Sequence, residues 1–331
     1  NYTSAKHVLE ISYVYSLGSI QGAVYENCTF RNSNTETAVY GNKNNQTFIG
    51  CTFLENRFEG NGEGPAALHI TDDGYFSLNN CSFINNVGKS KGGAVLTNIK
   101  NIVAFDDVRF IGNSLAKADK NIYGGALYID QDIEGNWYPV PYAIKNCYFQ
   151  DNSVPGEGSF GGAIHVKFVA DQYLVHTSPF TIEDCSFVGC SSYEAGGAIS
   201  SGEGNWHSTK ASGDLLINNC NFTDCKARYG GGVFSFDGDD ERDEETNITN
   251  CIFDHCSGTN GVCIYSKSYK FYLGDSLFMN NEKSYDFPYN SKDGPDSYIY
   301  LKMDEKECDP IIFNCTFRDN KISKMDTDVA G

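Results

Sequence analysis

One hexapeptide pattern recurs along most of this sequence and restricts the folds that it can adopt. The pattern is Cys-X-Phe-X-X-Asn, and three consecutive copies end in Cys instead of Asn. Seven copies are complete and three are degenerate; their phenylalanines are Phe30, Phe53, Phe83, Phe110, Phe149, Phe187, Phe222, Phe253, Phe278 and Phe317. Such self-similarity indicates a solenoid, in which each repeat packs against its neighbours.

A second motif, Gly-Gly-Ala followed by an aliphatic residue, alternates with the first. Clear copies are Gly92–Val95, Gly124–Leu127, Gly161–Ile164 and Gly196–Ile199, and Gly230–Val233 has Gly in place of Ala. Weaker copies lie around Ala23, Ala38, Ala67, Cys263 and Tyr298. The distance between successive motif phenylalanines varies from 23 residues (Phe30 to Phe53) to 39 (Phe278 to Phe317). This variation excludes a coiled coil and predicts coils with loops of different lengths.

Short runs of apolar and β-branched residues precede most Cys-X-Phe units and predict a further strand in each coil. Examples are residues 76–78, 180–182 and 271–273. No segment has a helical period, so the crossover helices of an ordinary parallel sheet are missing. Three short strands per coil predict an all-β fold, a single-stranded right-handed parallel β-helix of about ten coils.

The motif residues suit this geometry. Side chains alternate along a strand, so Cys and Phe of Cys-X-Phe share a face, which we expect to point inward and to form ladders. The Asn or Cys three residues after Phe is expected at the following turn. There an Asn can adopt left-handed backbone and bond to the coils above and below. The glycine pair is expected at a corner that needs positive φ or close packing.

The repeats cover residues 21–320 of one solenoid that spans residues 1–331. Residues 1–20 are expected to form an N-terminal cap or partial coil, and residues 321–331 the C-terminal end. The open ends of a β-helix invite stacking unless they are capped.

Alternating Phe-X-X-Asn and Gly-Gly-Ala-aliphatic tetrapeptides resemble the repeat of the chlamydial polymorphic membrane proteins, which protist surface proteins, including those of trichomonads, also contain. The resemblance covers roughly residues 20–320. It implies a β-helical surface protein, often an adhesin. The chain departs from the bacterial members because it has no C-terminal membrane β-barrel and because three coils replace Asn with Cys.

Composition favours a secreted chain. The 13 cysteines and seven Asn-X-Ser/Thr sequons indicate an oxidising, secretory route. The sequons begin at Asn1, Asn27, Asn45, Asn80, Asn221, Asn247 and Asn314. A net charge of −18 leaves no basic footprint for nucleic acid. No segment approaches the ~18 apolar residues of a membrane span. The expected location is extracellular or at the cell surface, as a mature chain or an excised ectodomain.

The cysteines allow three arrangements. Within-coil disulfides would join Cys185 to Cys190, Cys220 to Cys225 and Cys251 to Cys256, and Cys308 could pair with Cys315. Between-coil disulfides would join stacked cysteines, although parallel Cβ vectors suit such bonds poorly. Free thiols would pack as small hydrophobes. The count is odd, so at least one thiol is free or intermolecular. The regular spacing does not indicate zinc.

Four consecutive coils have long insertions after the Gly-Gly-Ala strand, near residues 129–141, 165–179, 200–213 and 234–246. They should leave from one corner of the coil and cluster on one side of the rod. The insertions contain aromatic residues suited to protein or glycan ligands, unless these only cover the flank. They are Trp137, Tyr138, Tyr173, Trp206 and His207.

The last insertion is strongly acidic and contains weak candidates for calcium ligands, at Asp237, Asp239, Asp240 and Asp243. It lacks the ligand spacing of an EF-hand, so a solvated charge run is the simpler interpretation. No cofactor motif is present: Gly156–Gly161 matches G-X-G-X-X-G but leads into a strand.

We therefore expect a non-enzymatic protein: an adhesin with protein or glycan ligands, or a structural subunit that assembles with copies of itself in a coat or filament. The alternative is a polysaccharide lyase or glycosidase, with Asp130, Asp132, Asp171 and Asp237 from adjacent coils as carboxylates. No Lys/Arg cluster accompanies them, and fold analogy alone is weak support.

Overall fold

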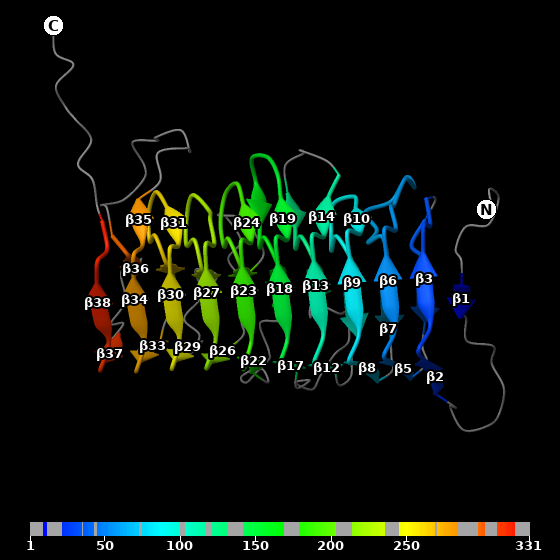
Figure 1. Ribbon diagram of the computed structural model, residues 1–331, viewed down its shortest axis with the longest axis horizontal. Helices are drawn as coiled ribbons and strands as arrows, with labels where there is room; N and C mark the ends of the chain where they lie inside the picture. The colour runs from blue at the N-terminus through cyan, green and yellow to red at the C-terminus, as the bar shows by residue number, and fades with distance from the viewer. Residues whose placement is uncertain are drawn as a thin grey trace, which may run out of the picture.

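The computed structural model describes residues 9–11, 22–34, 36–42, 45–72, 75–99, 103–116, 121–130, 142–168, 179–202, 214–235, 245–268, 270–283, 297–301 and 310–321. Within these ranges the chain is all-β, and every strand pair is parallel. Three ten-stranded sheets, which we call A, B and C, run side by side along the molecule (Figure 1). The predicted parallel β-helix of about ten coils is confirmed.

Each coil contributes one strand to each sheet. Sheet A contains the strands that follow the Gly-Gly-Ala motif: β1 (Leu9–Ile11), β4 (Val39–Asn42), β7 (Leu68–Asp72), β11 (Val95–Ile99), β16 (Leu127–Asp130), β21 (Ile164–Lys167), β25 (Ile199–Ser201), β28 (Val233–Ser235), β32 (Ile264–Ser266) and β36 (Ile299–Leu301). Sheet B contains β2 (Ala23–Glu26), β5 (Gln46–Ile49), β8 (Phe76–Asn79), β12 (Val103–Asp106), β17 (Tyr142–Lys145), β22 (Phe180–Glu183), β26 (Leu215–Asn218), β29 (Glu245–Thr249), β33 (Lys270–Gly274) and β37 (Ile311–Phe313).

Sheet C contains the Cys-X-Phe strands: β3 (Thr29–Arg31), β6 (Thr52–Leu54), β9 (Ser82–Ile84), β13 (Arg109–Ile111), β18 (Tyr148–Gln150), β23 (Ser186–Val188), β27 (Asn221–Thr223), β30 (Ile252–Asp254), β34 (Leu277–Met279) and β38 (Thr316–Arg318). Short strands lie between sheets C and A: β10 (Val87–Gly88), β14 (Ser114–Leu115), β15 (Ile122–Tyr123), β19 (Ser153–Val154), β20 (Ser159–Phe160), β24 (Ser191–Ser192), β31 (Ser257–Gly258) and β35 (Glu282–Lys283).

The coils wind with a right hand. In Figure 1 the chain rises through sheet C at the front, crosses to sheet A behind and returns through sheet B below, while it advances from right to left. This hand is the one that twisted parallel strands strongly favour. Stacked strands lie ~4.8 Å apart, so ten coils make a rod roughly 45–50 Å long.

The register corrects one detail of the repeat. Ala23 begins strand β2 of sheet B and lies opposite Gln46, so it is not a copy of the Gly-Gly-Ala motif. The sheet A strand of the first coil is β1, in which Leu9 lies opposite Val39. Part of the expected N-terminal cap is therefore a strand that continues sheet A.

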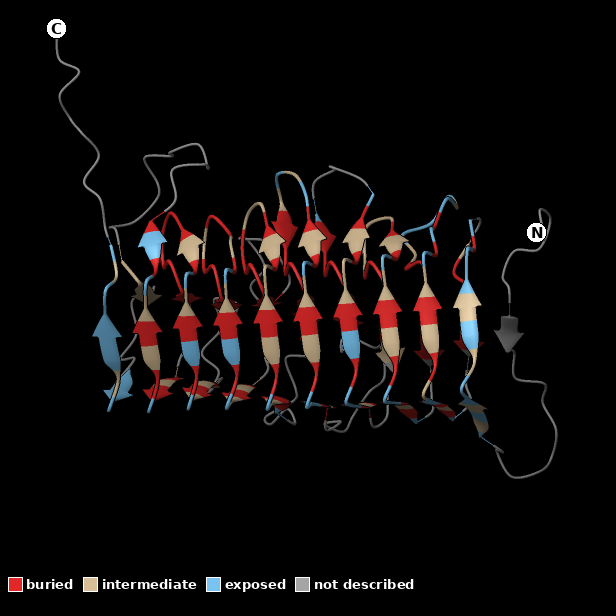
Figure 2. Cartoon of the chain, viewed as in Figure 1, coloured by how far each residue is buried: buried red, intermediate tan, exposed pale blue. Residues whose placement is uncertain are grey.

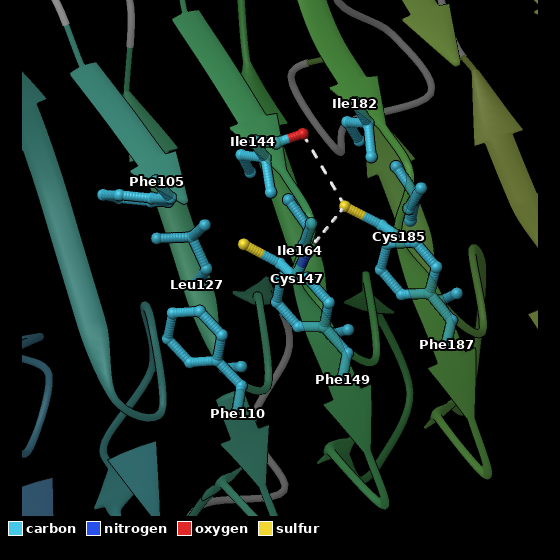
Figure 3. Close-up of a cluster of buried hydrophobic side chains, with 14 of the residues drawn as sticks. Phe105, Phe110, Leu127, Ile144, Cys147, Phe149, Ile164, Ile182, Cys185 and Phe187 are labelled. Atoms are coloured by element: carbon cyan, nitrogen blue, oxygen red, sulfur yellow. Dashed lines mark hydrogen bonds between the residues drawn. The ribbon is translucent and has the colours of Figure 1, made fainter. Parts of the chain in front are cut away.

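The core is built from columns of stacked side chains, one from each coil, and most columns contain apolar residues of similar type. Cys147 and Phe149 point inward together with Ile144 and Ile164 (Figure 3). The ten motif phenylalanines form one continuous stack, with ring centroids of successive coils 4.5–5.0 Å apart. This spacing matches the separation of parallel strands, so the backbone repeat itself sets the stacking distance.

A second column runs along the corner after each Cys-X-Phe strand. The side-chain amides of Asn56, Asn86, Asn113 and Asn152 are buried, and Nδ2 of each of the first three donates to Oδ1 of the next over 2.9–3.0 Å. Nδ2 of Asn152 instead lies 4.0 Å from Sγ of Cys190. Each Nδ2 also donates to the phenylalanine carbonyl of the preceding coil, as in Asn86 to Phe53 at 3.0 Å. The predicted bonding between coils is confirmed.

The predicted conformation of this Asn is wrong. The left-handed residue is the one before it, such as Glu55 (φ 54°), Asn85 (φ 52°) or Asp151 (φ 51°). The bend at that residue turns the motif Asn inward, where its amide can bond to neighbouring coils. A second left-handed residue, such as Asn80 (φ 48°) or Asn146 (φ 54°), stands before the motif Cys. Every strand of sheet C is therefore bounded by two sharp corners.

Candidate interaction surface

The strands that flank the four long insertions lie side by side at one corner of the coil, between sheets A and B. The insertions connect β16 to β17, β21 to β22, β25 to β26 and β28 to β29, and these strands are consecutive neighbours in sheets A and B. The predicted common corner is confirmed. The binding candidates Trp137, Tyr138, Tyr173, Trp206 and His207 lie outside the described residues, as do the acidic residues Asp237, Asp239, Asp240 and Asp243.

Beside this corner, the outward face of sheet A is covered by a second layer. Tyr128, His165 and Phe234 alternate with core residues and so face away from the core, yet each is at most 3% exposed. The segments between sheets C and A lie over them and contribute Tyr123 and Phe160, whose rings stack at 5.6 Å. The rod therefore has two apolar layers along sheet A.

His165 and Ser200 form a buried polar pair within this layer. Nδ1 of His165 lies 2.7 Å from Oγ of Ser200, and the two residues are opposite one another on β21 and β25. Burial lowers the pKa of His165 to about 3, because desolvation penalises the imidazolium. The ring is therefore neutral at physiological pH, and the pair is inaccessible to a substrate.

The buried neutral His165 should make stability depend on pH. The unfolded histidine binds a proton below its usual pKa of 6.5, whereas the folded one does so only near 3. The free energy of unfolding is therefore not reduced by His165 above pH 6.5. As the pH falls from 6.5 toward 3, protonation of His165 in the unfolded chain lowers it by ~1.4 kcal/mol per pH unit. We expect His165→Gln to have a shallower slope in urea unfolding between pH 6.5 and 4. The exposed control Asn79→Ala, which removes no titratable group, should keep the wild-type slope, and equal slopes in wild type and His165→Gln would contradict the assignment.

Among the carboxylates proposed for an enzyme, Asp130 is the one that the structure describes. Its Oδ1 lies 3.8 Å from Nζ of Lys167, and its Oδ2 accepts a hydrogen bond of 3.5 Å from the hydroxyl of Tyr128. Burial first, and then the charge of Asp130, raise the pKa of Tyr128. Asp132, Asp171 and Asp237 lie outside the described residues. The contacts of Asp130 are those of an ion pair between the ends of the neighbouring strands β16 and β21.

The cysteines lie in two columns at opposite ends of the sheet C strands. One column contains Cys28, Cys51, Cys81, Cys147, Cys185, Cys220, Cys251 and Cys315; the other continues the Asn column as Cys190, Cys225 and Cys256. All the described cysteines are free thiols. A whole strand, such as β23, separates Cys185 from Cys190, which places their Cα atoms on the order of 10 Å apart. Disulfides need less than ~7 Å, so this backbone excludes the within-coil pairs 185–190, 220–225 and 251–256.

The thiols pack as hydrophobic groups that also donate weak hydrogen bonds. Sγ of Cys185 lies 3.1 Å from the carbonyl oxygen of Glu183. It also lies 3.6 Å from the carbonyl oxygen of Ile144 and accepts from the backbone nitrogen of Cys147 at 3.4 Å (Figure 3). Burial raises the pKa of Cys81 to about 11 and that of Cys185 well above its usual value. Such thiols are poor nucleophiles in the folded protein. Cys308, the proposed partner of Cys315, lies outside the described residues.

The sequons are on the surface where the structure describes them. Asn27, Asn45, Asn80, Asn221 and Asn314 are exposed, and Asn247 on β29 is partly buried. Asn27, Asn80 and Asn314 occupy the left-handed corner between sheets B and C. Asn1 lies outside the described residues.

The C-terminal coil has a large exposed apolar surface. Ile311, Ile312, Phe313 and Phe317 are 45–48% exposed, whereas the equivalent residues of inner coils, such as Leu273 and Phe278, are buried. Figure 2 shows β37 and β38 exposed beside the buried strands of the preceding coil. At the other end, Val24 is 59% exposed. Strands β36, β37 and β38 are the last of their sheets, so each leaves one edge unpaired within the described chain.

Two features were missed by reasoning from sequence. His165 stands in an Ile-His-Val strand, and the alternation of side chains along the strand places it outward. No motif in the sequence predicts the layer of side chains that covers it. Cys263 was treated only as part of a weak Gly-Gly-Ala copy, although it is a fully buried thiol.

Within the described ranges, no helix is long and apolar enough to cross a bilayer, and no group of three His, Cys, Asp or Glu side chains is arranged to hold a metal ion. No family model, curated protein or solved structure matches the chain, so its relation to the polymorphic membrane protein repeat stays a prediction drawn from the motifs.

Proposed function

We propose that this chain is a non-enzymatic extracellular structural protein, which associates with further copies of itself end to end. The observation that carries this proposal is the open C-terminal coil, with its exposed Ile311–Phe313 strand and exposed Phe317. Soluble proteins usually blunt such edges with charges, Pro or covering segments, because unpaired strands recruit other strands. An apolar end formed by three unpaired strands is suited to a partner with the same three-sheet repeat.

The N-terminal coil of a second copy presents such a repeat. Strands β1, β2 and β3 are the first strands of sheets A, B and C, and their outer edges are unpaired within the described chain. Head-to-tail stacking would place Phe30 on Phe317 and Cys28 on Cys315, which would continue the two columns across the junction. Such a contact joins different surfaces and does not close on itself, so it generates filaments rather than dimers.

Exposure of the described sequons other than Asn247 supports the extracellular location, because oligosaccharides need accessible asparagines. The large negative charge would keep separate rods apart at low salt. Assembly should therefore be promoted when salt screens this repulsion.

The test compares end and flank substitutions of the purified chain. We expect wild-type protein to form rods of several unit lengths in negative-stain electron microscopy, and larger species in sedimentation velocity as concentration and salt increase. Phe317→Asp and Ile312→Asp should abolish this growth. The matched control is Ile252→Asp, at a residue 37% exposed on the flank of sheet C, which should leave growth unchanged. Monodisperse single rods in every condition, or equal loss in the control, would overturn the proposal.

Adhesion is the second candidate. It is favoured by the anchoring of four long insertions on consecutive strands, because a rigid scaffold presenting neighbouring loops is a common design for binding. A glycan array distinguishes this candidate from assembly, because ligand binding by the insertions does not need the coil ends.

A further inference from the structure

Cys263 occupies a position that small residues fill in other coils. In the Gly-Gly-Ala motif, the equivalent residues are Ala94, Ala126, Ala163 and Ala198, with Gly232 in the preceding coil. These positions are buried, and each precedes a sheet A strand. A thiol in this column adds a sulfur atom where the fold otherwise accommodates a methyl group or a hydrogen.

The substitution occurs in a coil that already has a cysteine at the facing corner. Three coils carry Cys in place of the motif Asn, and the residues across the corner are Ala198 for Cys190, Gly232 for Cys225 and Cys263 for Cys256. The two sides of this corner are in contact in the preceding coil. There, a Cβ on Gly231, the neighbour of Gly232, would lie 3.0 Å from the carbonyl oxygen of Cys225. Among these three coils, Cys256 alone has a second thiol across the corner.

The two thiols meet inside the core. Cys256 and Cys263 are both 0% exposed and belong to the same core cluster, and each thiol contributes to the pKa shift of the other. A bend of six residues, which includes β31, connects them, so their side chains approach from opposite sides of the corner. We propose that Cys256 and Cys263 form a disulfide that closes this corner of the β-helix when the chain folds in an oxidising compartment. This inference is independent of end-to-end assembly.

The reaction balances as a thiol–disulfide exchange with a small disulfide such as oxidised glutathione, or with an oxidised dithiol protein. One thiolate attacks the incoming disulfide and releases a thiol; the second thiolate then attacks the mixed disulfide and releases the other thiol. Two protons and two electrons leave the cysteines, and one S–S bond replaces two S–H bonds. Because both thiols are buried, the exchange takes place before the core closes.

The stacked neighbour Cys225 competes less well for Cys256. Their strands are parallel and in register, so their Cβ atoms lie ~4.8 Å apart with parallel directions. Disulfides need Cβ atoms about 3.5–4.5 Å apart on converging vectors. Cys256 and Cys263 are not held parallel in this way, because they stand on opposite sides of the bend that contains β31.

The test uses alkylation of the unreduced, denatured chain after refolding with reduced and oxidised glutathione. Trypsin releases residues 243–267 as one peptide with Cys251, Cys256 and Cys263, after removal of any glycan from Asn247. We expect that peptide to be 2 Da lighter and to carry one alkyl group, on Cys251. Reductant present during heating should lower the Tm of the oxidised protein by about 5 °C.

Two variants make the outcome specific. Cys263→Ala restores the residue found in other coils and should fold, but Cys256 should become alkylated and the effect of reductant on the Tm should vanish. Cys251→Ala, the matched control, should keep both the bridge and the response to reductant. Three alkylated cysteines in the wild-type peptide, or a bond from Cys256 to Cys225 or Cys251, would overturn the proposal.

Discussion

Gly93→Ala should prevent this chain from folding stably, although it adds a single methyl group. The added Cβ would lie 1.8 Å from the carbonyl oxygen of Gly125 in the next coil and 2.6 Å from that of Ser114. Both obstacles are backbone atoms, so no side-chain rotation relieves the clash. The coils would have to separate where Gly93 donates to the carbonyl of Gly124 at 2.9 Å. We expect the free energy of unfolding to fall by more than ~4 kcal/mol, the range of severe core defects.

The measurement is urea or thermal unfolding followed by circular dichroism. Gly62→Ala is the matched control, because Gly62 is exposed and the nearest atom to its new Cβ is Cζ of Phe58 at 3.8 Å. This control should change stability by less than ~0.5 kcal/mol or stabilise slightly, since alanine restricts the unfolded chain. A wild-type midpoint for Gly93→Ala would show that the two coils are not in the close contact described here.

Asn113→Ala should destabilise the rod by ~3–6 kcal/mol, because it removes a fully buried amide with four hydrogen bonds. Oδ1 of Asn113 accepts from the backbone nitrogen of Asn86 at 3.0 Å and from its Nδ2 at 2.9 Å. Nδ2 of Asn113 donates to the carbonyl of Phe83 at 2.9 Å and to Oδ1 of Asn152 at 3.0 Å. Alanine leaves these groups in a dry core without partners.

Two further variants separate hydrogen bonding from packing. Asn113→Cys should be less damaging than alanine, because the same column accommodates Cys190, Cys225 and Cys256. Asn79→Ala removes an exposed asparagine of sheet B and should be nearly neutral. Equal denaturation midpoints for Asn113→Ala and Asn79→Ala would show that the hydrogen bonds of the Asn column do not stabilise the rod.

The repeat motifs predict the architecture well, for a definite physical reason. Stacked coils place the same residue in the same environment ten times, so Cys-X-Phe and Gly-Gly-Ala report the core and the corner directly. The two glycines even divide the two roles expected of the pair. Gly92 has φ 64°, whereas Gly93 lacks positive φ but has no room for a Cβ.

Other features depend on three-dimensional detail that spacing does not contain. The five-residue interval from Cys185 to Cys190 suggests a disulfide, but the intervening strand β23 is extended and holds the thiols apart. The hexapeptide also cannot show that Asp151, rather than Asn152, takes the left-handed conformation. The layer over sheet A comes from segments without a motif, so its aromatic residues gave no periodic pattern to follow.

The Asn column also gives the rod an electrical direction. Every bond between asparagine side chains from Asn56 to Asn152 has its donor on the N-terminal side and its acceptor on the C-terminal side, so these bond dipoles add and strengthen one another along the axis. The same sense reappears from Asn281 to Asn320. The column ends in Ser33 at the N-terminal coil and in Asn320 at the C-terminal coil, so the two ends of the rod differ chemically. A filament built from such units would have all its subunits facing the same way, with two chemically distinct tips.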